Sequence, residues 1–360
     1  MKNKLTPKFD ENNIAVVLCT DDNYAKYCAV SIQSIIEKAN KKNNYDIIIF
    51  DGGISEQAKK KNALMIKGLK NFSIRYVNVE KLLEDVDMSV FFVDQWFSIA
   101  AYYRIFIPRA VSKYEKILYM DCDIVLNDDI AKAYNIDLDG KIAGVVTECV
   151  IEYLINQNPK AKDFHLDTLG LKKPQQYFNS GFMLLNVKRM QEEKYEQKII
   201  DATRVFTPQH VDQDLFNYVF KNDIKFLDMK YNFMCGLLSA NIDFYDYLSE
   251  ETYFEYMKSH REAKVIHYTG SLKPWHKKDL IFHDLWWLYA KNTPFIKEIN
   301  QEYRKHRGYE DQENNTKPEM SNNNVKLVKK KFLGVVKITK RNKVLTRVKI
   351  LGITIYKTKG

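Results

Sequence analysis

The sequence predicts an α/β protein with a doubly wound, mainly parallel central sheet and flanking helices. Short apolar runs alternate with stretches of helical periodicity in the N-terminal part of the chain, which is the βαβαβ order of such sheets. The chain has 360 residues, 45% of them hydrophobic, so it can bury the core of one large domain or two modest ones. Its strongest charge bias falls at the C-terminal end, outside the alternating pattern.

The N-terminal half supplies most of the predicted strands. We expect strands at 14–19, 45–50, 73–78 and 142–147, because each is a short apolar run bounded by polar or turn residues. Helices are expected from 25 to 40, where Asp21 or Asp22 can cap the start, and from 55 to 67. A largely apolar helix is expected over 96–108, ended by Pro108, with Arg104 as its only strong charge. An Arg in such a helix either pairs with a structural carboxylate or reaches a bound anion.

The second half is less regular. We expect a surface segment at 160–176, followed by a strand over 177–187 that Gly181 interrupts, a feature of strands approached closely by a ligand or another backbone. Helices are expected at 188–203 and 211–220, and short strands at 224–227 and 265–267.

Residues 1–310 are predicted to form the main domain, 311–324 a polar linker and 325–360 a separate tail. The tail contains twelve Lys or Arg and no Asp or Glu, so it accounts for the net charge of +10 and leaves the body nearly neutral. Its basic residues alternate with aliphatic ones, which predicts a β-hairpin-like module that attaches to the anionic inner face of the cell membrane. A nucleic-acid-binding arm is a weaker alternative because the tail has few stacking aromatics, and an ordinary solvated basic tail is the third.

Five cysteines without a Cys-x-x-Cys pair suit a reducing compartment. The sequence shows neither an apolar run long enough to span a bilayer nor the apolar core of a signal peptide. We therefore expect a cytoplasmic protein that associates peripherally with the inner face of the membrane.

The stretch 116–126 carries the first chemical signal. It is predicted as one buried strand in which Asp121 and Asp123, two residues apart, point to the same side. Two carboxylates at the carboxyl end of a strand would repel each other unless a divalent cation lay between them, which predicts a metal and phosphate site. Two alternatives are a solvated turn and the nucleophile strand of a haloacid-dehalogenase-like phosphatase.

The second signal is the stretch 265–275. His267 could be a third metal ligand, although a lone His beside a strand is more often structural. Gly270 allows close backbone approach to a phosphate, and Lys273 supplies a positive charge for it.

Several motifs together resemble the retaining glycosyltransferases of family 8, which have the GT-A fold. They are Thr20-Asp-Asp-Asn-Tyr24, Tyr103-Arg104, Asp121-Cys-Asp123, Tyr177-Phe-Asn-Ser-Gly181, Asp212-Gln-Asp214 and His267-x-x-Gly270-x-x-Lys273-Pro-Trp275. The resemblance spans about residues 14 to 275, and the dehalogenase alternative explains only one of these motifs. The resemblance to family 8 implies a hexosyltransferase that moves glucose or galactose from a UDP-sugar to a glycan, in lipooligosaccharide, lipopolysaccharide or capsule assembly.

The resemblance also implies roles for individual residues. Asp121, Asp123 and His267 would bind Mn²⁺, or Mg²⁺ in its place, against the diphosphate of the UDP-sugar. Asp21, Asn23 and Tyr24 would hold uridine and ribose, and Cys19, Thr20 and Cys122 belong to the same donor site. Gly270 and Lys273 would contact the diphosphate, and Arg104, Asn179 and Asp212 would orient the sugar. Gln213 would lie near the face of the anomeric carbon opposite the departing UDP.

The acceptor is expected to be a lipid-linked glycan, and nucleic acid is not expected as a partner. Two other functions stay open: a sugar-nucleotide-binding protein without catalysis, and a glycosyltransferase for a protein or a soluble acceptor. A nucleotidyltransferase that makes UDP-sugars would need a Gly-rich phosphate loop after the first strand, and the sequence has none there.

Overall fold

The computed structural model describes residues 4–92, 99–240 and 244–306, and the backbone of three strands between 335 and 359. The strands of the body are β1 (Asn13–Thr20), β2 (Asn44–Asp51), β3 (Phe72–Asn78), β4 (Lys116–Met120), β5 (Ile124–Leu126), β6 (Ala143–Thr147), β7 (Phe178–Asn186), β8 (Ile224–Phe226), β9 (Phe233–Met234) and β10 (Val265–His267). The α-helices are α1 (Ala25–Lys38), α2 (Glu56–Met65), α3 (Val79–Leu82), α4 (Ile107–Ala110), α5 (Ala131–Tyr134), α6 (Cys149–Gln157), α7 (Pro159–Lys162), α8 (Val187–Glu192), α9 (Tyr195–Ala202), α10 (Val211–Phe220), α11 (Gly236–Ser239), α12 (Glu250–Glu262), α13 (His283–Ala290) and α14 (Ile296–His306). Short 3-10 and π helices are η1 (Met88–Val90), η2 (Ile99–Phe106), η3 (Asp163–Thr168), η4 (Pro174–Gln176), η5 (Met229–Asn232) and η6 (Tyr245–Tyr247).

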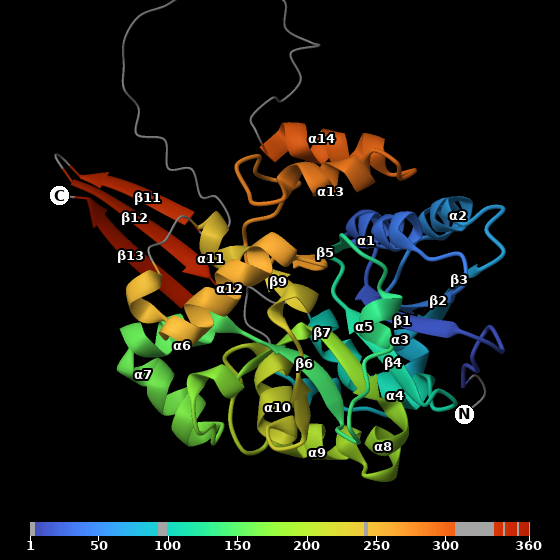
Figure 1. Ribbon diagram of the computed structural model, residues 1–360, viewed down its shortest axis with the longest axis horizontal. Helices are drawn as coiled ribbons and strands as arrows, with labels where there is room; N and C mark the ends of the chain where they lie inside the picture. Colours follow the sequence, from blue (N-terminus) through green and yellow to red (C-terminus); the bar gives the residue numbers. More distant parts are fainter. Residues whose placement is uncertain are drawn as a thin grey trace, which may run out of the picture.

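The central sheet confirms the predicted fold class. Its order is β3-β2-β1-β4-β7-β6-β8, and β1 to β4 lie parallel to one another, as do β6 and β8. Only β7 runs antiparallel to its neighbours, β4 and β6, within this sheet. Figure 1 shows α1 and α2 on one side of the sheet and α8 to α10 on the other.

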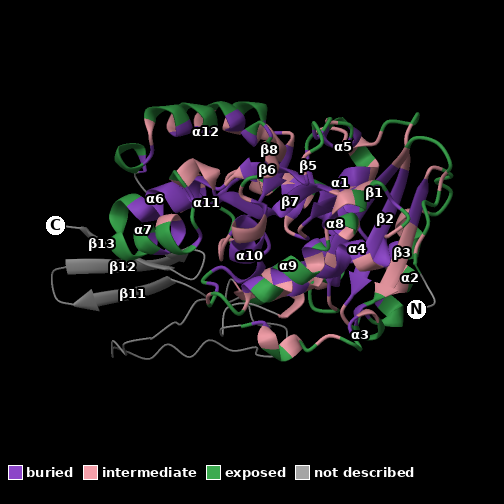
Figure 2. Ribbon diagram, turned by 90° about the horizontal axis from the view of Figure 1, so that it is seen from below, coloured by how far each residue is buried: buried purple, intermediate pink, exposed green. Residues whose placement is uncertain are grey.

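Burial explains why the N-terminal strands were visible in the sequence. The residues of β1 and β2 are almost all buried, as the colours of Figure 2 show, because helices cover both faces of the parallel strands. Continuous apolar runs therefore mark these strands, and the bounds of the predicted elements from 14 to 78 are confirmed within a few residues. The predicted cap by Asp21 or Asp22 is wrong, because Tyr24 is the N-cap residue of α1 and no side chain among the described residues caps this helix.

The prediction of one strand over 116–126 is wrong. The chain forms β4, turns at Asp121–Asp123, and then forms β5, which pairs antiparallel with β10 in a second sheet of order β5-β10-β9. The turn is held by neighbours far away in the sequence: the Ser31 hydroxyl donates to the Cys122 carbonyl (2.9 Å), and the Tyr268 amide donates to the Asp123 carbonyl (3.0 Å). As a result, two carboxylates that a strand would have placed along one face lie instead in a turn at the edge of the central sheet.

The helix predicted over 96–108 is also different. Residues 96–98 lie outside the described residues, and η2 takes up the next stretch as a 3-10 helix. Pro108 does not end a helix but lies in the first turn of α4. Residues in the first turn have no acceptor within the helix for their N–H, so a proline there loses no hydrogen bond.

Two predictions for the second half need correction. Residues 160–176 are not a surface segment, because they form α7, η3 and η4 and bury side chains such as His165 and Leu169. The single helix predicted at 188–203 is divided into α8 and α9 at Lys194, which has a left-handed backbone with φ of 55°. Helices α6, α12, α13 and α14 were not predicted, since aromatic and polar side chains obscure their periodicity.

The tail contains three strands rather than one hairpin: β11 (Val335–Lys340), β12 (Lys343–Ile350) and β13 (Ile353–Lys359), paired antiparallel in that order. The predicted linker at 311–324 and the apolar and basic faces of the tail lie outside the described residues. Within the described part of the chain, no helix has both the length and the apolar character needed to cross a bilayer.

Candidate active site

Three chain segments end at one edge of the structure. The turn after β1 begins at Thr20, the turn after β4 contains Asp121 and Asp123, and β10 ends at His267. The carboxyl ends of parallel strands commonly form the binding edge of an α/β sheet. Residues from different parts of the sequence therefore converge here.

Asp121, Asp123 and His267, which we call the edge site, have ligand atoms within 4.8 Å of one another. His267 Nε2 lies 3.2 Å from Asp123 Oδ1 and 3.8 Å from Asp121 Oδ2. The two carboxylates are partly exposed and the imidazole is buried. The three predicted metal ligands are thus brought together in the structure.

A chain of amides orients His267. Its Nδ1 lies 3.0 Å from Asn232 Oδ1, which can only accept a hydrogen bond, so Nδ1 carries the proton and Nε2 presents a lone pair to the carboxylates. Asn232 Nδ2 donates to Asn179 Oδ1 (3.0 Å), and Asn179 Nδ2 donates to Glu148 Oε2 (2.8 Å). Burial raises the pKa of Glu148, while its bond from Asn179 opposes this. These side chains fix the tautomer of the imidazole.

Gly181 on β7 makes room for the edge site. A Cβ at this position would lie 2.3 Å from His267 Cε1 and 2.6 Å from Asp121 Oδ2, which is too close for any side chain. Its backbone also holds the turn, because the Asp121 amide donates to the Gly181 carbonyl (2.8 Å). The Gly that interrupts the predicted strand therefore permits a close approach, as its position suggested.

Two buried cations compensate the carboxylates. Arg104 Nη1 lies 3.0 Å from Asp121 Oδ1 and Arg104 Nε lies 3.2 Å from Asp212 Oδ2, so Arg104 bridges two acids. Lys273 Nζ contacts Asp123 and also donates to the Tyr268 carbonyl (2.6 Å). Burial opposes ionisation of Asp123, but the positive charge of Lys273 outweighs it and lowers the pKa of this carboxyl. Asp123 therefore remains ionised, as a metal-binding carboxylate must be.

The start of α10 places Asp212 and Gln213 beside this network. Burial raises the pKa of Asp212 to about 7, against the charge of Arg104, and the Ser180 hydroxyl donates to its Oδ2 (3.1 Å). Gln213 Oε1 accepts from the Ser180 amide (3.0 Å), and its Nε2 donates to the Tyr177 hydroxyl (3.2 Å). Both side chains are held rigidly by β7 and the residue before it.

The turn after β1 forms the other side of the edge. Asp21 accepts a hydrogen bond from the Tyr24 amide (3.0 Å), and the Thr20 carbonyl accepts one from the Gly52 amide (2.9 Å). Asn23 is exposed in this turn. Tyr24 lies edge-on to Trp275, with ring centroids 6.1 Å apart. This contact joins the turn to the segment that carries Lys273.

The remaining predicted residues lie around the same edge. Cys19 is half-buried in the last part of β1, and its carbonyl accepts a weak hydrogen bond from the Cys122 thiol (3.3 Å). Gly270 has a φ of +74°, a conformation that favours glycine, and its missing side chain would meet open space. It thus leaves backbone accessible in the turn after β10.

The residues present fit a divalent metal ion. Two carboxylates and an imidazole suit Mn²⁺ or a similar ion, the imidazole lone pair faces the carboxylates, and Gly181 leaves the space free. Asp123 Oδ1 is buried without a hydrogen-bond partner among the described residues, as expected of an atom that awaits a ligand.

Comparison with known proteins agrees with this geometry. The sequence model of Glycosyl transferase family 8 matches residues 15–279. The chain belongs to glycosyl transferase family 8. Like other family members it is an enzyme, and the motifs that resembled this family all lie within the matched range or at its edge.

Individual relatives are similar over most of the chain. A lipopolysaccharide 1,2-glucosyltransferase of Escherichia coli K12 is 29% identical over 268 residues, 71% of this chain and 71% of that protein. The apo structure of the bifunctional glycosyltransferase WbbM has a TM-score of 0.72 at 28% identity over 83% of this chain, which spans 53% of WbbM. The galactosyltransferase LgtC, solved with donor and acceptor sugar analogs, has a TM-score of 0.64 at 22% identity, covering 80% of this chain and 100% of LgtC, and shows the shared fold. The GT-A fold prediction is confirmed.

Several residues of the site were missed in the sequence. Asn232 bonds to His267, Glu148 to Asn179, and Ser180 to Asp212. No sequence motif contains Asn232 or Glu148. Ser180 lies within the motif at 177–181, but no role was predicted for it. Their roles depend on contacts between residues 31 to 53 positions apart, which a single sequence does not display.

Proposed function

We propose that this family 8 enzyme is a retaining hexosyltransferase that uses a divalent cation, Mn²⁺ or Mg²⁺, at the edge site. The observation that carries the proposal is the convergence of two carboxylates and an oriented imidazole within 4.8 Å at the binding edge of the sheet. The donor would be a UDP-hexose, with uridine and ribose held by the turn at Asp21, Asn23 and Tyr24. The glucosyl and galactosyl transfer named for two of its relatives supports a hexose donor.

The acceptor would be a glycan, and a lipid-linked one in lipooligosaccharide, lipopolysaccharide or capsule assembly is our first choice. One relative is named for lipopolysaccharide, which supports this acceptor class.

Several charged groups would stabilise the diphosphate leaving group and position the sugar. A bound divalent cation supplies Lewis-acid stabilisation of the diphosphate leaving group. Lys273 holds Asp123 ionised and adds a positive charge on the side where the diphosphate would lie, together with backbone at Gly270. Arg104 forms ion pairs with Asp121 and Asp212 and lies between them. Together with Asn179 it would orient the donor sugar. Developing negative charge would thus meet preformed positive charge.

The side chain near the anomeric carbon would be Gln213. A carboxamide is a poor nucleophile, and both polar atoms of this one are already hydrogen-bonded to Ser180 and Tyr177. Retaining glycosidases use a carboxylate as nucleophile instead. We therefore propose that the acceptor hydroxyl attacks from the face that UDP leaves. The bond from C1 to the phosphate oxygen breaks, the bond from C1 to the acceptor oxygen forms, and the acceptor proton passes to the departing phosphate.

A panel of UDP-sugars, incubated with the chain and candidate glycans with and without Mn²⁺, tests the proposal when products are identified by mass spectrometry. Metal-dependent transfer of one hexose with retained configuration is the expected result. Binding of UDP-sugar without transfer or hydrolysis would identify a binding protein without catalysis, and transfer by a chelator-treated sample would remove the metal from the mechanism.

We also propose that residues 325–360 are a module separate from the domain at 1–310, with 311–324 as a linker, and that it attaches the enzyme to anionic lipid. Twelve cations support this, since each contributes roughly 1 kcal/mol near an anionic membrane surface. Liposome flotation of the full chain and of a truncation before residue 325 tests it. Equal binding of the two proteins to phosphatidylserine vesicles would overturn it.

A further inference from the structure

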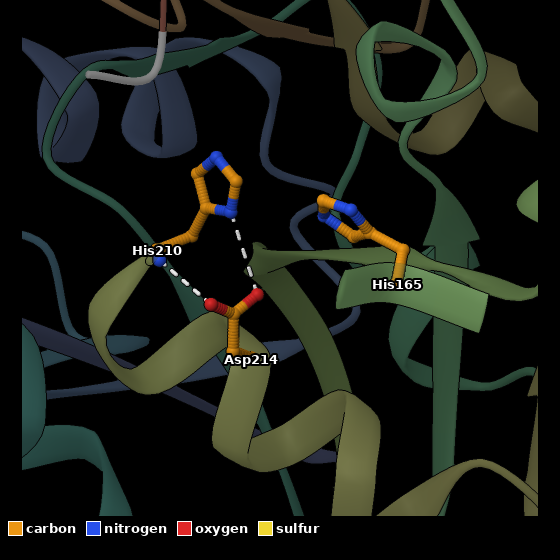
Figure 3. Close-up of side chains that lie close together, drawn as sticks. All are labelled: His165, His210 and Asp214. Carbon is orange, nitrogen blue, oxygen red and sulfur yellow. Dashed lines mark hydrogen bonds and ion pairs between the residues drawn. The ribbon is translucent and has the colours of Figure 1, made fainter. Parts of the chain in front are cut away.

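A second group of histidine and aspartate side chains, shown in Figure 3, is connected to the active site through Tyr177. His165 comes from η3, while His210 and Asp214 come from the start of α10. We call these three residues the buried cluster, since their exposed fractions are 0%, 2% and 0%. One nitrogen or oxygen atom of each lies within 4.8 Å of the others.

His165 presents an unused lone pair to this cluster. Its Nδ1 lies 2.7 Å from the Ala161 carbonyl oxygen, which can only accept, so Nδ1 carries the proton and Nε2 is bare. Nε2 is fully buried and has no hydrogen-bond partner among the described residues. Burial also lowers the pKa of His165, which keeps the ring neutral. Donation from the other ring nitrogen to a backbone carbonyl is the usual arrangement of a metal-bound histidine.

His210 is similarly short of partners. Both of its ring nitrogens are buried without a hydrogen bond among the described residues, and Nδ1 lies 3.4 Å from Asp214 Oδ1. Its ring centroid is 5.7 Å from that of His165. Buried polar atoms are normally paired, so the bare Nε2 of His165 and the ring nitrogen of His210 that does not face Asp214 call for a ligand.

Asp214 supplies negative charge. Its Oδ2 accepts from the amides of Gln209 (2.6 Å) and His210 (2.7 Å), and its Oδ1 accepts from the Tyr177 hydroxyl (2.6 Å) and keeps a second lone pair. Burial opposes its ionisation, but His210 and these hydrogen bonds lower its pKa. Within the described part of the chain, no Lys or Arg forms an ion pair with it.

We propose that the buried cluster binds a structural Zn²⁺ ion. His165 Nε2, one ring nitrogen of His210 and Asp214 Oδ1 would be its protein ligands, a donor set that zinc accepts, with water as the fourth ligand. The ion would satisfy the unpaired nitrogens and neutralise the buried carboxylate. Because the cluster is closed, the metal would enter during folding.

The ion would anchor the segment that carries the catalytic residues. Val211, between His210 and Asp212, has a φ of +42°, which is strained for a β-branched residue and persists only where the surroundings enforce it. Ligation on both sides of Val211 would enforce it. Tyr177 also connects the cluster to the active site, since it donates to Asp214 and accepts from Gln213.

The test must separate this ion from metal at the edge site. A background variant, Asp121→Asn with Asp123→Asn and His267→Gln, removes the edge site, and the full chain is purified and treated with a weak chelator. We expect elemental analysis to find about one zinc ion per chain, as for a four-coordinate structural site. Adding His165→Gln should abolish this zinc.

A matched control uses the surface cluster of His276, Glu302 and His306, a third metal-like grouping whose members are all half-buried. Adding His276→Gln to the background instead should leave the zinc in place. Absence of zinc from the background, or its retention after His165→Gln, would overturn the proposal. If His165→Gln prevents folding, X-ray absorption spectroscopy of zinc in the background protein tests the proposal instead. Two imidazoles among the zinc ligands would support the site. Sulfur ligands or a fully hydrated ion would refute it.

Discussion

The edge site and the buried cluster contain the same types of side chain in opposite surroundings. At the edge site the carboxylates are partly exposed and Arg104 and Lys273 compensate them within the protein. In the buried cluster the single carboxylate, Asp214, is fully buried, and no Lys or Arg among the described residues forms an ion pair with it. A group of ligands that already has cations nearby can exist with or without a metal ion, and this suits binding and release of a charged substrate. A buried group of ligands without a nearby Lys or Arg suits a metal ion that stays bound.

Breaking the edge site should have the largest effect. Asp123→Asn removes a ligand charge that Lys273 helps to keep ionised, and we expect hexose transfer from UDP-hexose to the acceptor to fall by about 10³-fold, as for loss of several kcal/mol of metal stabilisation. Turnover against Mn²⁺ concentration measures this. Asp284→Asn, whose side chain is fully exposed, is the control and should keep wild-type turnover. Unchanged activity of Asp123→Asn would refute the metal assignment.

The support of His267 should come next. Asn232→Leu removes the acceptor that fixes the proton on Nδ1, so the apparent affinity for Mn²⁺ should fall by roughly 10–100-fold, with a smaller change in kcat at saturating metal. Asn232→Asp keeps an acceptor oxygen and should restore part of the affinity. A folded Asn232→Leu protein with wild-type Mn²⁺ dependence would show that Asn232 does not position the imidazole.

The connection between the two sites should have a moderate effect. Tyr177→Phe removes the hydroxyl between Asp214 and Gln213, and loss of hydrogen bonds of this kind predicts a fall in kcat of about tenfold without a change in Mn²⁺ dependence. Tyr195→Phe removes a similar bond to Asp223 away from the site and should affect stability alone. Equal kcat values for the two variants would disconnect the buried cluster from catalysis.

The surface cluster of His276, Glu302 and His306 provides the smallest effect and extends the comparison to a half-buried group. A hydrogen bond from His276 and the charge of Lys26 lower the pKa of Glu302 below its ordinary value of 4.5. Its contribution to stability is therefore present above that pH and is lost as the pH falls through the lower, folded-state value. We expect Glu302→Gln to lower the melting temperature by a few degrees at pH 7 and progressively less below pH 4.5. Glu255→Gln, at an exposed position, should show no such trend.

The predictions from sequence succeeded where one physical signal dominates. Buried parallel strands are continuous apolar runs, so β1 to β3 and the helices between them were found. They failed where tertiary contacts decide: the Asp121–Asp123 turn, predicted as part of one strand, depends on a hydrogen bond from the distant Ser31. The surface assignment of residues around His165 failed because its few apolar side chains are buried by other elements.

The sequence by itself determined the fold class and the identity of the charged and imidazole side chains at the ends of β4 and β10, because these follow from local apolar runs and from short spacings. Only the tertiary structure decided how those side chains are used. Asn232 fixes the tautomer of His267, Lys273 sets the charge of Asp123, and η3 brings His165 beside Asp214, since each of these effects requires direct contact between residues that are far apart in the chain.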